Sequence, residues 1–222
     1  MAKQVNTEEN TELQEAISAS GQWIIKNQNL LMWCLCGILA VIVAVMAFNN
    51  YYLTPKNQEA ADAVGKAVVY FANDNYEAAL NGMDDQFMGF EEIADTYGIT
   101  KSGKLAAVYA GICHYNLGNY EEAVHYLGKY NADDLNIAPA VMMKKGDAYA
   151  EMGETQKAAS CFMKAGKADN AVIAPIALKK AGIAYTAMGD TKAARKAYET
   201  IKEKYPQSQE AQDIDKYILS AE

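Results

Sequence analysis

The side chains of this chain best suited to catalysis or metal binding are two histidines, His114 and His125. They fall on two consecutive predicted helices, where they could form a metal site or an acid–base pair. A metal site needs further Cys, His or carboxylate ligands at set spacings, and neither histidine has them. This favours the alternative that both are ordinary packing or surface residues. The sequence also lacks a glycine-rich phosphate loop, a nucleophile elbow and a metal motif, so we expect a non-enzymatic protein with no catalytic residues, cofactor, metal or small-molecule substrate.

The four cysteines also have ordinary interpretations. Cys34 and Cys36 lie inside an apolar run, and no small residue stands directly before Cys34 as a lipobox would need. Cys113 and Cys161 fall at core spacing on helices of neighbouring units; they are either core residues or, in an oxidising compartment, the halves of a disulfide. The net charge of −8 and the pI near 4.9 argue against nucleic acid as a partner, because nucleic-acid binding needs a basic stripe.

An internal repeat indicates which secondary-structure elements would carry a functional surface. Residues 137–162 read IAPAVMMKKGDAYAEMGETQKAASCF, and residues 173–198 read IAPIALKKAGIAYTAMGDTKAARKAY. The two stretches lie 36 residues apart and are identical at 11 of 26 positions. A fixed period near 34 residues is the signature of a helical repeat array. Such arrays mostly present a surface to a partner, which indicates a binding protein.

Small residues recur at fixed places in both copies. Gly146 and Gly182 fall midway along the first helix, and Ala158 and Ala194 fall on the second. Helices packed about 8–10 Å apart need small side chains where they cross, so we expect these residues to lie at helix contacts. We expect glycines of positive φ to end helices at Gly118, Gly153 and Gly189, and prolines to occupy the first helical turn at Pro139 and Pro175.

The repeated block resembles the tetratricopeptide repeat, which has small and aromatic residues at the same positions along its two helices. The matching residues are Gly146, Tyr149, Gly153, Ala158, Phe162 and Ala165 in one copy, and Gly182, Tyr185, Gly189, Ala194, Tyr198 and Pro206 in the next. An earlier copy has Gly111, Gly118, Ala123 and Leu127, with His114 where the aromatic residue should be. A still earlier copy fits only at Ala67, Tyr70, Asp74 and Ala79. Residues 84–100 depart from the pattern, and there we expect a short extra helix over residues 90–97.

Residues 30–48 form a run of 19 residues without a charge. At 1.5 Å per residue this run just crosses a hydrocarbon core of about 30 Å. Trp23 and Trp33 lie towards one end of the run and Tyr51 and Tyr52 towards the other, as aromatic residues do at membrane interfaces. The alternative is a signal peptide that is cleaved at residues 45–47. The segment before the apolar run is 29 residues long and acidic, which favours an uncleaved anchor. The flanking lysines do not decide the orientation.

In layout, nearly the whole chain resembles membrane-anchored tetratricopeptide proteins of Gram-negative bacteria and, more broadly, the family of the ancillary subunit of the bacterial Sec translocon. The resemblance implies a single-pass inner-membrane protein with a cytoplasmic N-terminus and a periplasmic array. We expect an all-α fold with one transmembrane helix, a superhelix of helical hairpins and a C-terminal capping helix. The expected segments are an acidic segment at 1–29 with Glu8, Glu9, Glu12 and Glu15, a transmembrane helix at 30–52 and an array at 53–222 (repeats 57–100, 104–137, 139–172 and 175–206, capping helix 208–221).

The resemblance also implies where partners bind, because in tetratricopeptide arrays the first helix of each pair lines the inner, concave surface. The groove positions are then Val64, Val68, Phe71, Leu105, Val108, Ile112, Tyr115, Met143, Ile176, Lys179 and Ile183. Most are apolar, which favours apolar segments of other proteins over a terminal carboxylate, since only Lys179 and Asn116 approach a carboxylate clamp. The alternative is a groove filled internally by residues 87–97 or by the capping helix.

Two functions fit this surface. The first is a membrane-tethered interaction scaffold or chaperone-like adaptor for envelope proteins, with a place beside the translocon implied by the resemblance. The second is a structural scaffold for the assembly of outer-membrane or cell-wall machinery. Both predict protein partners and the inner membrane, and neither predicts nucleic acid or a small molecule.

Overall fold

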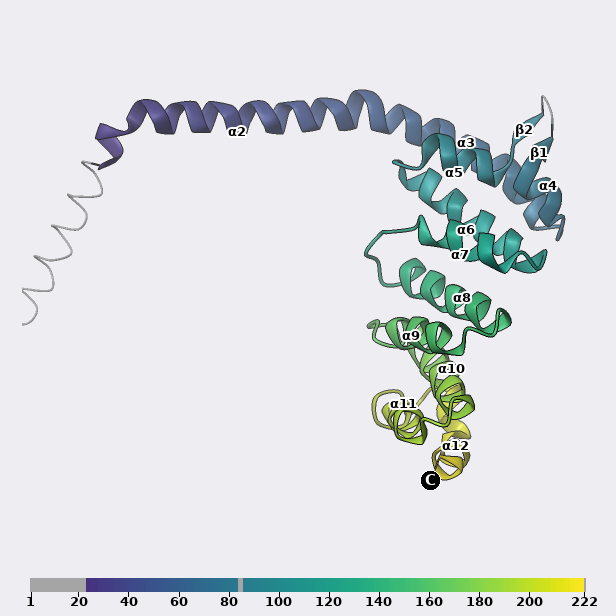
Figure 1. Ribbon diagram of the computed structural model, residues 1–222. Coiled ribbons are helices and arrows are strands. Elements are labelled where there is room, and N and C mark those ends of the chain that lie inside the picture. Colours follow the sequence, from purple (N-terminus) through teal and green to yellow (C-terminus); the bar gives the residue numbers. More distant parts are fainter. Residues whose placement is uncertain (1–22, 84–85, 222) are drawn as a thin grey trace, which may run out of the picture. The chain divides into compact units, whose positions relative to one another are not determined.

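The computed structural model describes residues 23–83 and 86–221, and these are almost entirely helical (Figure 1). The expected all-α fold is confirmed; the described strands, β1 (Gly82–Met83) and β2 (Phe87–Met88), are two residues long each. The chain divides into two compact units, Met1–Thr54 and Pro55–Glu222. The glutamates of the expected acidic segment lie outside the described residues, as do Asp84 and Asp85.

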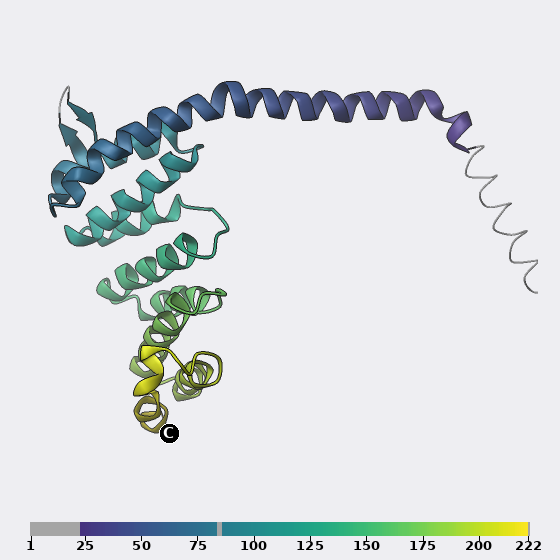
Figure 2. The ribbon, with the colours of Figure 1, turned by 180° about the vertical axis from the view of Figure 1, so that it is seen from behind.

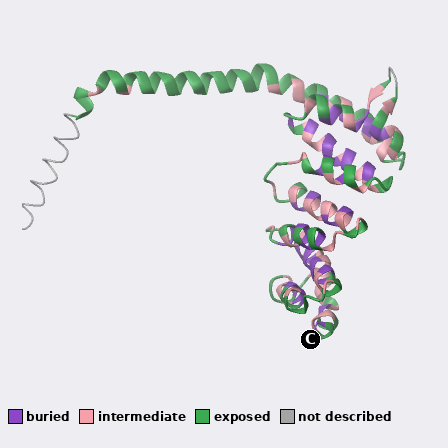
Figure 3. Cartoon of the chain, in the orientation of Figure 1, coloured by how far each residue is buried: buried purple, intermediate pink, exposed green. Residues whose placement is uncertain are grey.

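The first unit is dominated by α2 (Gln28–Phe48), a helix of 21 residues, which a π-helical stretch follows (Asn49–Leu53). No residue of α2 is buried and none is charged. Figure 3 shows this helix exposed along most of its length. The helical stretch Gln28–Phe71 is long and apolar enough, by length and composition, to cross a membrane.

The second unit begins with α3 (Thr54–Phe71) and α4 (Tyr76–Asn81), followed by the β1–β2 hairpin and α5 (Phe90–Tyr97). The helix α5 has the bounds that the sequence predicts, whereas the hairpin was not predicted. An aromatic cluster joins these elements to the next helix: the Phe71 ring meets those of Phe90 and Tyr109 edge-on at 6.2 and 5.1 Å, and Phe90 stacks on Tyr109 at 4.9 Å. The helices α3, α4, α5 and α6 therefore share one core cluster.

Three helix pairs follow, stacked in chain order (Figures 1 and 2). They are α6 (Lys101–Asn116) with α7 (Tyr120–Gly128), α8 (Ile137–Glu151) with α9 (Thr155–Ala165), and α10 (Ile173–Ala187) with α11 (Thr191–Lys204). Each helix contacts the next, and α8 also contacts α6 and α10. Buried residues lie on the mutually packed faces of the stacked helices (Figure 3).

The expected helix ends are confirmed. Gly118, Gly153 and Gly189 have φ values of 82°, 75° and 75°, and each follows the first helix of a pair. A residue with a Cβ is strained in this left-handed region, so glycine is the natural helix terminator here. Pro139 and Pro175 lie in the first turns of α8 and α10, where a missing N–H leaves no hydrogen bond unmade.

The expected packing role of the mid-helix glycines is also confirmed. A Cβ at Gly146 would lie 2.5 Å from Cε1 of Phe162, and one at Gly111 would lie 2.5 Å from Cγ of Leu127. A Cβ at Gly182 would collide with the ring of Tyr198 in the same way. In all three pairs the partner side chain comes from the second helix, 16 residues later. The large side chain of the second helix therefore rests on the bare backbone of the first.

The chain closes with a 3-10 turn (Gln209–Gln212) and α12 (Ile214–Ser220). Ser208 caps the 3-10 turn, because its Oγ accepts a hydrogen bond from the backbone N–H of Ala211 at 3.2 Å. The sequence predicts one helix over 208–221; the structure instead breaks it at Asp213, which leaves the helical region with φ −117° and ψ 7°. The break lets Ile214, 1% exposed, pack into the last core cluster with Tyr198 and Ile201.

Candidate protein-binding surface

The accessible side chains of α6, α8 and α10 form one surface, because these helices are neighbours in the stack. We call it the A-helix surface. Six of the eleven predicted groove residues belong to it: Leu105, Ile112, Tyr115, Met143, Ile176 and Ile183. Five of them are half-buried, and Ile183 is 48% exposed. Their apolar atoms are available for contact with a partner.

Four predicted groove residues lie elsewhere. Val64 and Val108 are each only 8% exposed, and both are core residues. Val68 and Phe71 are half-buried and pack against the cluster that α3, α4, α5 and α6 share. The physical reason is that α5 occupies the space beside α3, so these side chains are covered by their own chain. The first copy therefore adds nothing to the A-helix surface.

The eleventh residue, Lys179, is engaged by the C-terminal segment. Its Nζ lies 2.7 Å from Oδ1 of Asp213 and 4.6 Å from the centre of the Tyr217 ring. Burial alone would lower the pKa of Lys179, but the hydrogen bond from its ammonium group to Asp213 and the charge of that carboxylate outweigh burial and raise it. The same hydrogen bond lowers the pKa of Asp213. At this end of the array the groove is thus covered from within, as the internally filled alternative expects.

Paired charges run between the apolar side chains of the A-helix surface. Nζ of Lys144 lies 4.1 Å from the centre of the Tyr115 ring and 3.8 Å from Asp147, and Nζ of Lys180 lies 2.6 Å from Oδ1 of Asp147. These contacts link α6 to α8 and α8 to α10. The sequence prediction missed Lys144 and Lys180, although they occupy one of the 11 positions identical in both copies. Lys144 and Lys180 share the single carboxylate of Asp147, and a partner on this surface meets the apolar side chains beside these charges.

The two histidines do not meet. His114 is 5% exposed; its Nε2 lies 2.7 Å from Oε1 of Glu91 and its ring stacks on Tyr126 at 5.3 Å, whereas His125 is exposed. Across residues 23–83 and 86–221, no group of three His, Cys, Asp or Glu side chains is placed to hold a metal ion. His114 is thus packed between Glu91 and Tyr126.

Cys113 and Cys161 are separate free thiols on α6 and α9, both buried, so the disulfide alternative is wrong. Burial raises the pKa of the Cys113 thiol to about 12. Both residues serve the core, where a thiol behaves as a small apolar group.

Comparison with known proteins supports the repeat architecture. Two family models of the tetratricopeptide repeat match the chain, one over residues 139–171 and the other over residues 177–208. These segments hold α8 with α9 and most of α10 with α11. No curated protein matches the sequence. The two matched segments are tetratricopeptide repeats, and the contact between Gly111 and Leu127 extends the same packing to α6 and α7.

Proposed function

We propose that this chain, which carries tetratricopeptide repeats, is a non-enzymatic scaffold that binds other polypeptides on its A-helix surface. The observation that carries the proposal is the composition of that surface. Half-buried and exposed apolar side chains lie beside charges that already pair with one another, such as Lys180 with Asp147. Apolar burial is then the main source of binding energy, at roughly 25 cal/mol per Å² removed from water. The preferred partner is an apolar segment rather than a terminal carboxylate.

The proposal includes a membrane anchor. It is supported by the uncharged helix α2, which buries no residue within the described chain, and by the layout that resembles anchored tetratricopeptide proteins. With the N-terminus in the cytoplasm and the array in the periplasm, the protein is an inner-membrane adaptor with chaperone-like binding of envelope proteins. The same layout motivates a position beside the Sec translocon. The alternative is a scaffold for outer-membrane or cell-wall assembly, and the two differ in their partners.

Quantitative co-purification from native membranes tests the proposal. Ile183→Ser and Met143→Ser remove apolar contact from the A-helix surface and should each reduce partner recovery several-fold, as truncations at a binding hot spot do. Val172→Ser is the matched control, because Val172 is 72% exposed but lies in the loop before α10. Equal loss in all three variants, or in none, contradicts binding at the A-helix surface.

The identity of the recovered partners separates the two roles. Translocon subunits together with many newly exported polypeptides support the adaptor. A small fixed set of outer-membrane or cell-wall assembly proteins supports the alternative.

A further inference from the structure

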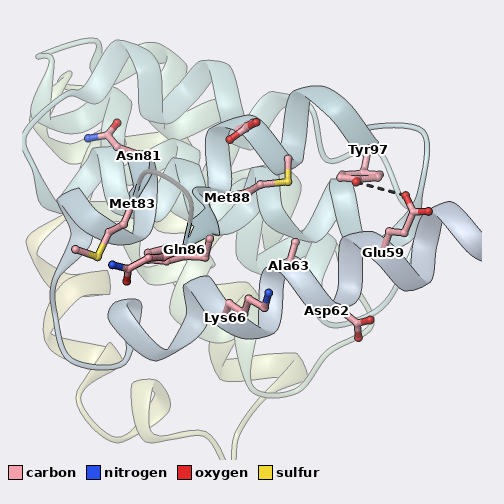
Figure 4. Close-up of a pocket in the computed structure, with 11 residues that line it drawn as sticks. Glu59, Asp62, Ala63, Lys66, Asn81, Met83, Gln86, Met88 and Tyr97 are labelled. Atoms are coloured by element: carbon pink, nitrogen blue, oxygen red, sulfur yellow. Dashed lines mark hydrogen bonds between the residues drawn. The ribbon is translucent and has the colours of Figure 1, made fainter.

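A cavity of about 570 Å³ lies between α3, the β1–β2 hairpin and α5, outside the repeated helix pairs (Figure 4). The helix α3 contributes Glu59, Asp62, Ala63 and Lys66, which form one stripe at helical spacing. The end of α4 supplies Asn81, and the hairpin and α5 supply the rest of the lining. None of the A-helix surface residues lines this cavity.

The hairpin gives the cavity an apolar part that is held in place. The Phe87 ring stacks on Tyr70 at 4.5 Å with an angle of 15° between the rings, and Met88 is half-buried beside it. Met83 is 43% exposed and also lines the cavity. Aromatic rings and flexible thioethers accept a range of apolar side chains. The cavity is thus large enough, and apolar enough, to take an aliphatic or aromatic side chain.

The charged part of the lining is mainly acidic. Glu59 is 3.6 Å from Nζ of Lys56 and 3.5 Å from the hydroxyl of Tyr97, and Asp62 accepts a hydrogen bond from the side-chain amide of Gln58 at 3.3 Å. The carboxylate of Glu92 has neither a hydrogen-bond partner nor an ion pair among residues 23–83 and 86–221.

The sequence around the cavity also carries a net negative charge. Residues 55–100 contain nine Asp and Glu against two Lys, a formal charge of −7, whereas residues 151–204 contain ten Lys and Arg against six acidic residues, a charge of +4. The cavity therefore lies in the most acidic stretch of the second unit, and this field draws cationic groups toward it.

We propose that this cavity is a second binding site, for a basic segment of a partner polypeptide that carries one apolar side chain between lysines or arginines. The apolar side chain enters between Met83, Phe87 and Met88, and the flanking cations meet Glu92, Asp62 and Glu59. Arginine and lysine keep their charged groups at the rim while their aliphatic stems cover apolar surface. An acidic segment is repelled, and an uncharged apolar segment lacks the electrostatic contribution.

This site does not depend on the proposed A-helix surface, and salt distinguishes the two. Binding that relies on exposed carboxylates weakens as ionic strength rises, because the Debye length falls to about 10 Å at 0.1 M salt and about 3 Å at 1 M. Apolar burial is not screened in this way. The two sites share no lining residue, so a mutation that weakens binding at one site should leave binding at the other unchanged.

The test uses the full-length protein in a non-ionic detergent and a fluorescein-labelled peptide of nine residues, eight Lys or Arg around a central Phe. Fluorescence anisotropy gives the affinity. Two probes control for chemistry: one with Glu in place of every cation, and one with Ser in place of Phe. The basic apolar peptide should bind and the acidic one should not. The Ser peptide should bind at least about fivefold more weakly, because it lacks the apolar side chain whose burial favours binding.

Two variants locate the site. Glu92→Gln should weaken binding about three- to fivefold and reduce its salt dependence, the effect of losing one exposed ion pair. Glu77→Gln is the matched control: both glutamates lie in the first turn of a helix in the acidic stretch, but Glu77 does not line the cavity. Met83→Ser should weaken binding without changing its salt dependence.

Equal effects of Glu92→Gln and Glu77→Gln would show a diffuse electrostatic attraction and overturn the proposal. Binding of the acidic peptide, or retention of affinity in Met83→Ser, would overturn it too. Persistence of peptide binding in Ile183→Ser is expected, since that variant affects only the A-helix surface.

Discussion

Replacing Gly146 by alanine should destabilise the array, although the same change in most helices is stabilising. Mid-helix alanine is favoured over glycine by about 1 kcal/mol. At Gly146 the new Cβ would lie 2.5 Å from Cε1 and 2.6 Å from Cδ1 of Phe162, whereas ordinary contact begins at 3.4 Å. The ring must retreat by roughly 1 Å, and Phe162 is 4% exposed and enclosed by Ala158 and Ala181. Overpacking of this kind costs about 1–3 kcal/mol.

Gly65→Ala is the matched control, because Gly65 lies within α3 and a Cβ there would meet nothing within 4 Å. It should stabilise by up to about 1 kcal/mol, so the two variants should differ by about 1–3 kcal/mol in the free energy of unfolding. Urea unfolding of residues 55–222, followed by circular dichroism, measures both. Adding Phe162→Leu to Gly146→Ala should cost less than adding it to the wild type, since the smaller side chain relieves the clash. Stabilisation by Gly146→Ala equal to that by Gly65→Ala would refute the assigned contact.

Three further predictions concern the anchor, the C-terminal segment and the core. The protein should stay in the membrane pellet after alkaline carbonate washing, and the array should be digested by protease in spheroplasts; release by carbonate, or digestion only after the inner membrane is lysed, contradicts the anchor and its orientation. Ile214→Ala should lower the free energy of unfolding by about 2–4 kcal/mol, because Ile214 is 1% exposed in the last core cluster; the exposed Leu219→Ala is its control. The Cys113 thiol is protonated in the folded and unfolded states below pH 9, and between pH 9 and about 12 it ionises only in the unfolded state, so the free energy of unfolding falls as pH rises. Cys113→Ala should therefore lose less stability than wild type between about pH 8 and pH 10. Equal losses in the two proteins would contradict the buried thiol.

The features that the sequence predicted are those fixed by local sterics and repeated in the chain. Gly153 and Gly189 end helices because only a residue without a Cβ takes their backbone conformation freely, and that requirement is visible in one sequence. Gly146 and Gly182 recur at the repeat offset, which indicates a packing role even without coordinates. The helix at Phe90–Tyr97 follows from its apolar spacing.

The features that were missed depend on contacts between distant residues. The β1–β2 hairpin has strands too short for a periodic pattern, and its Phe87 is held by Tyr70, which belongs to α3. Phe71 occupies a groove position by counting, yet α5 and α6 enclose it through Phe90 and Tyr109. Lys179 is engaged by Asp213, 34 residues away in the chain. In each case a partner residue comes from a segment that departs from the repeat: residues 84–100 supply Phe87 and Phe90, and the C-terminal segment supplies Asp213.

Site-specific photocrosslinking in native membranes tests the central claim most directly, namely that the A-helix surface binds polypeptides. A photoreactive residue is placed at Ile183, which is 48% exposed on α10, and in a second protein at Lys157, an exposed residue of α9. The account predicts crosslinked polypeptides from Ile183 that persist as salt is raised, and few from Lys157. Equal labelling from both positions, or labelling from Ile183 that disappears with salt, would contradict it.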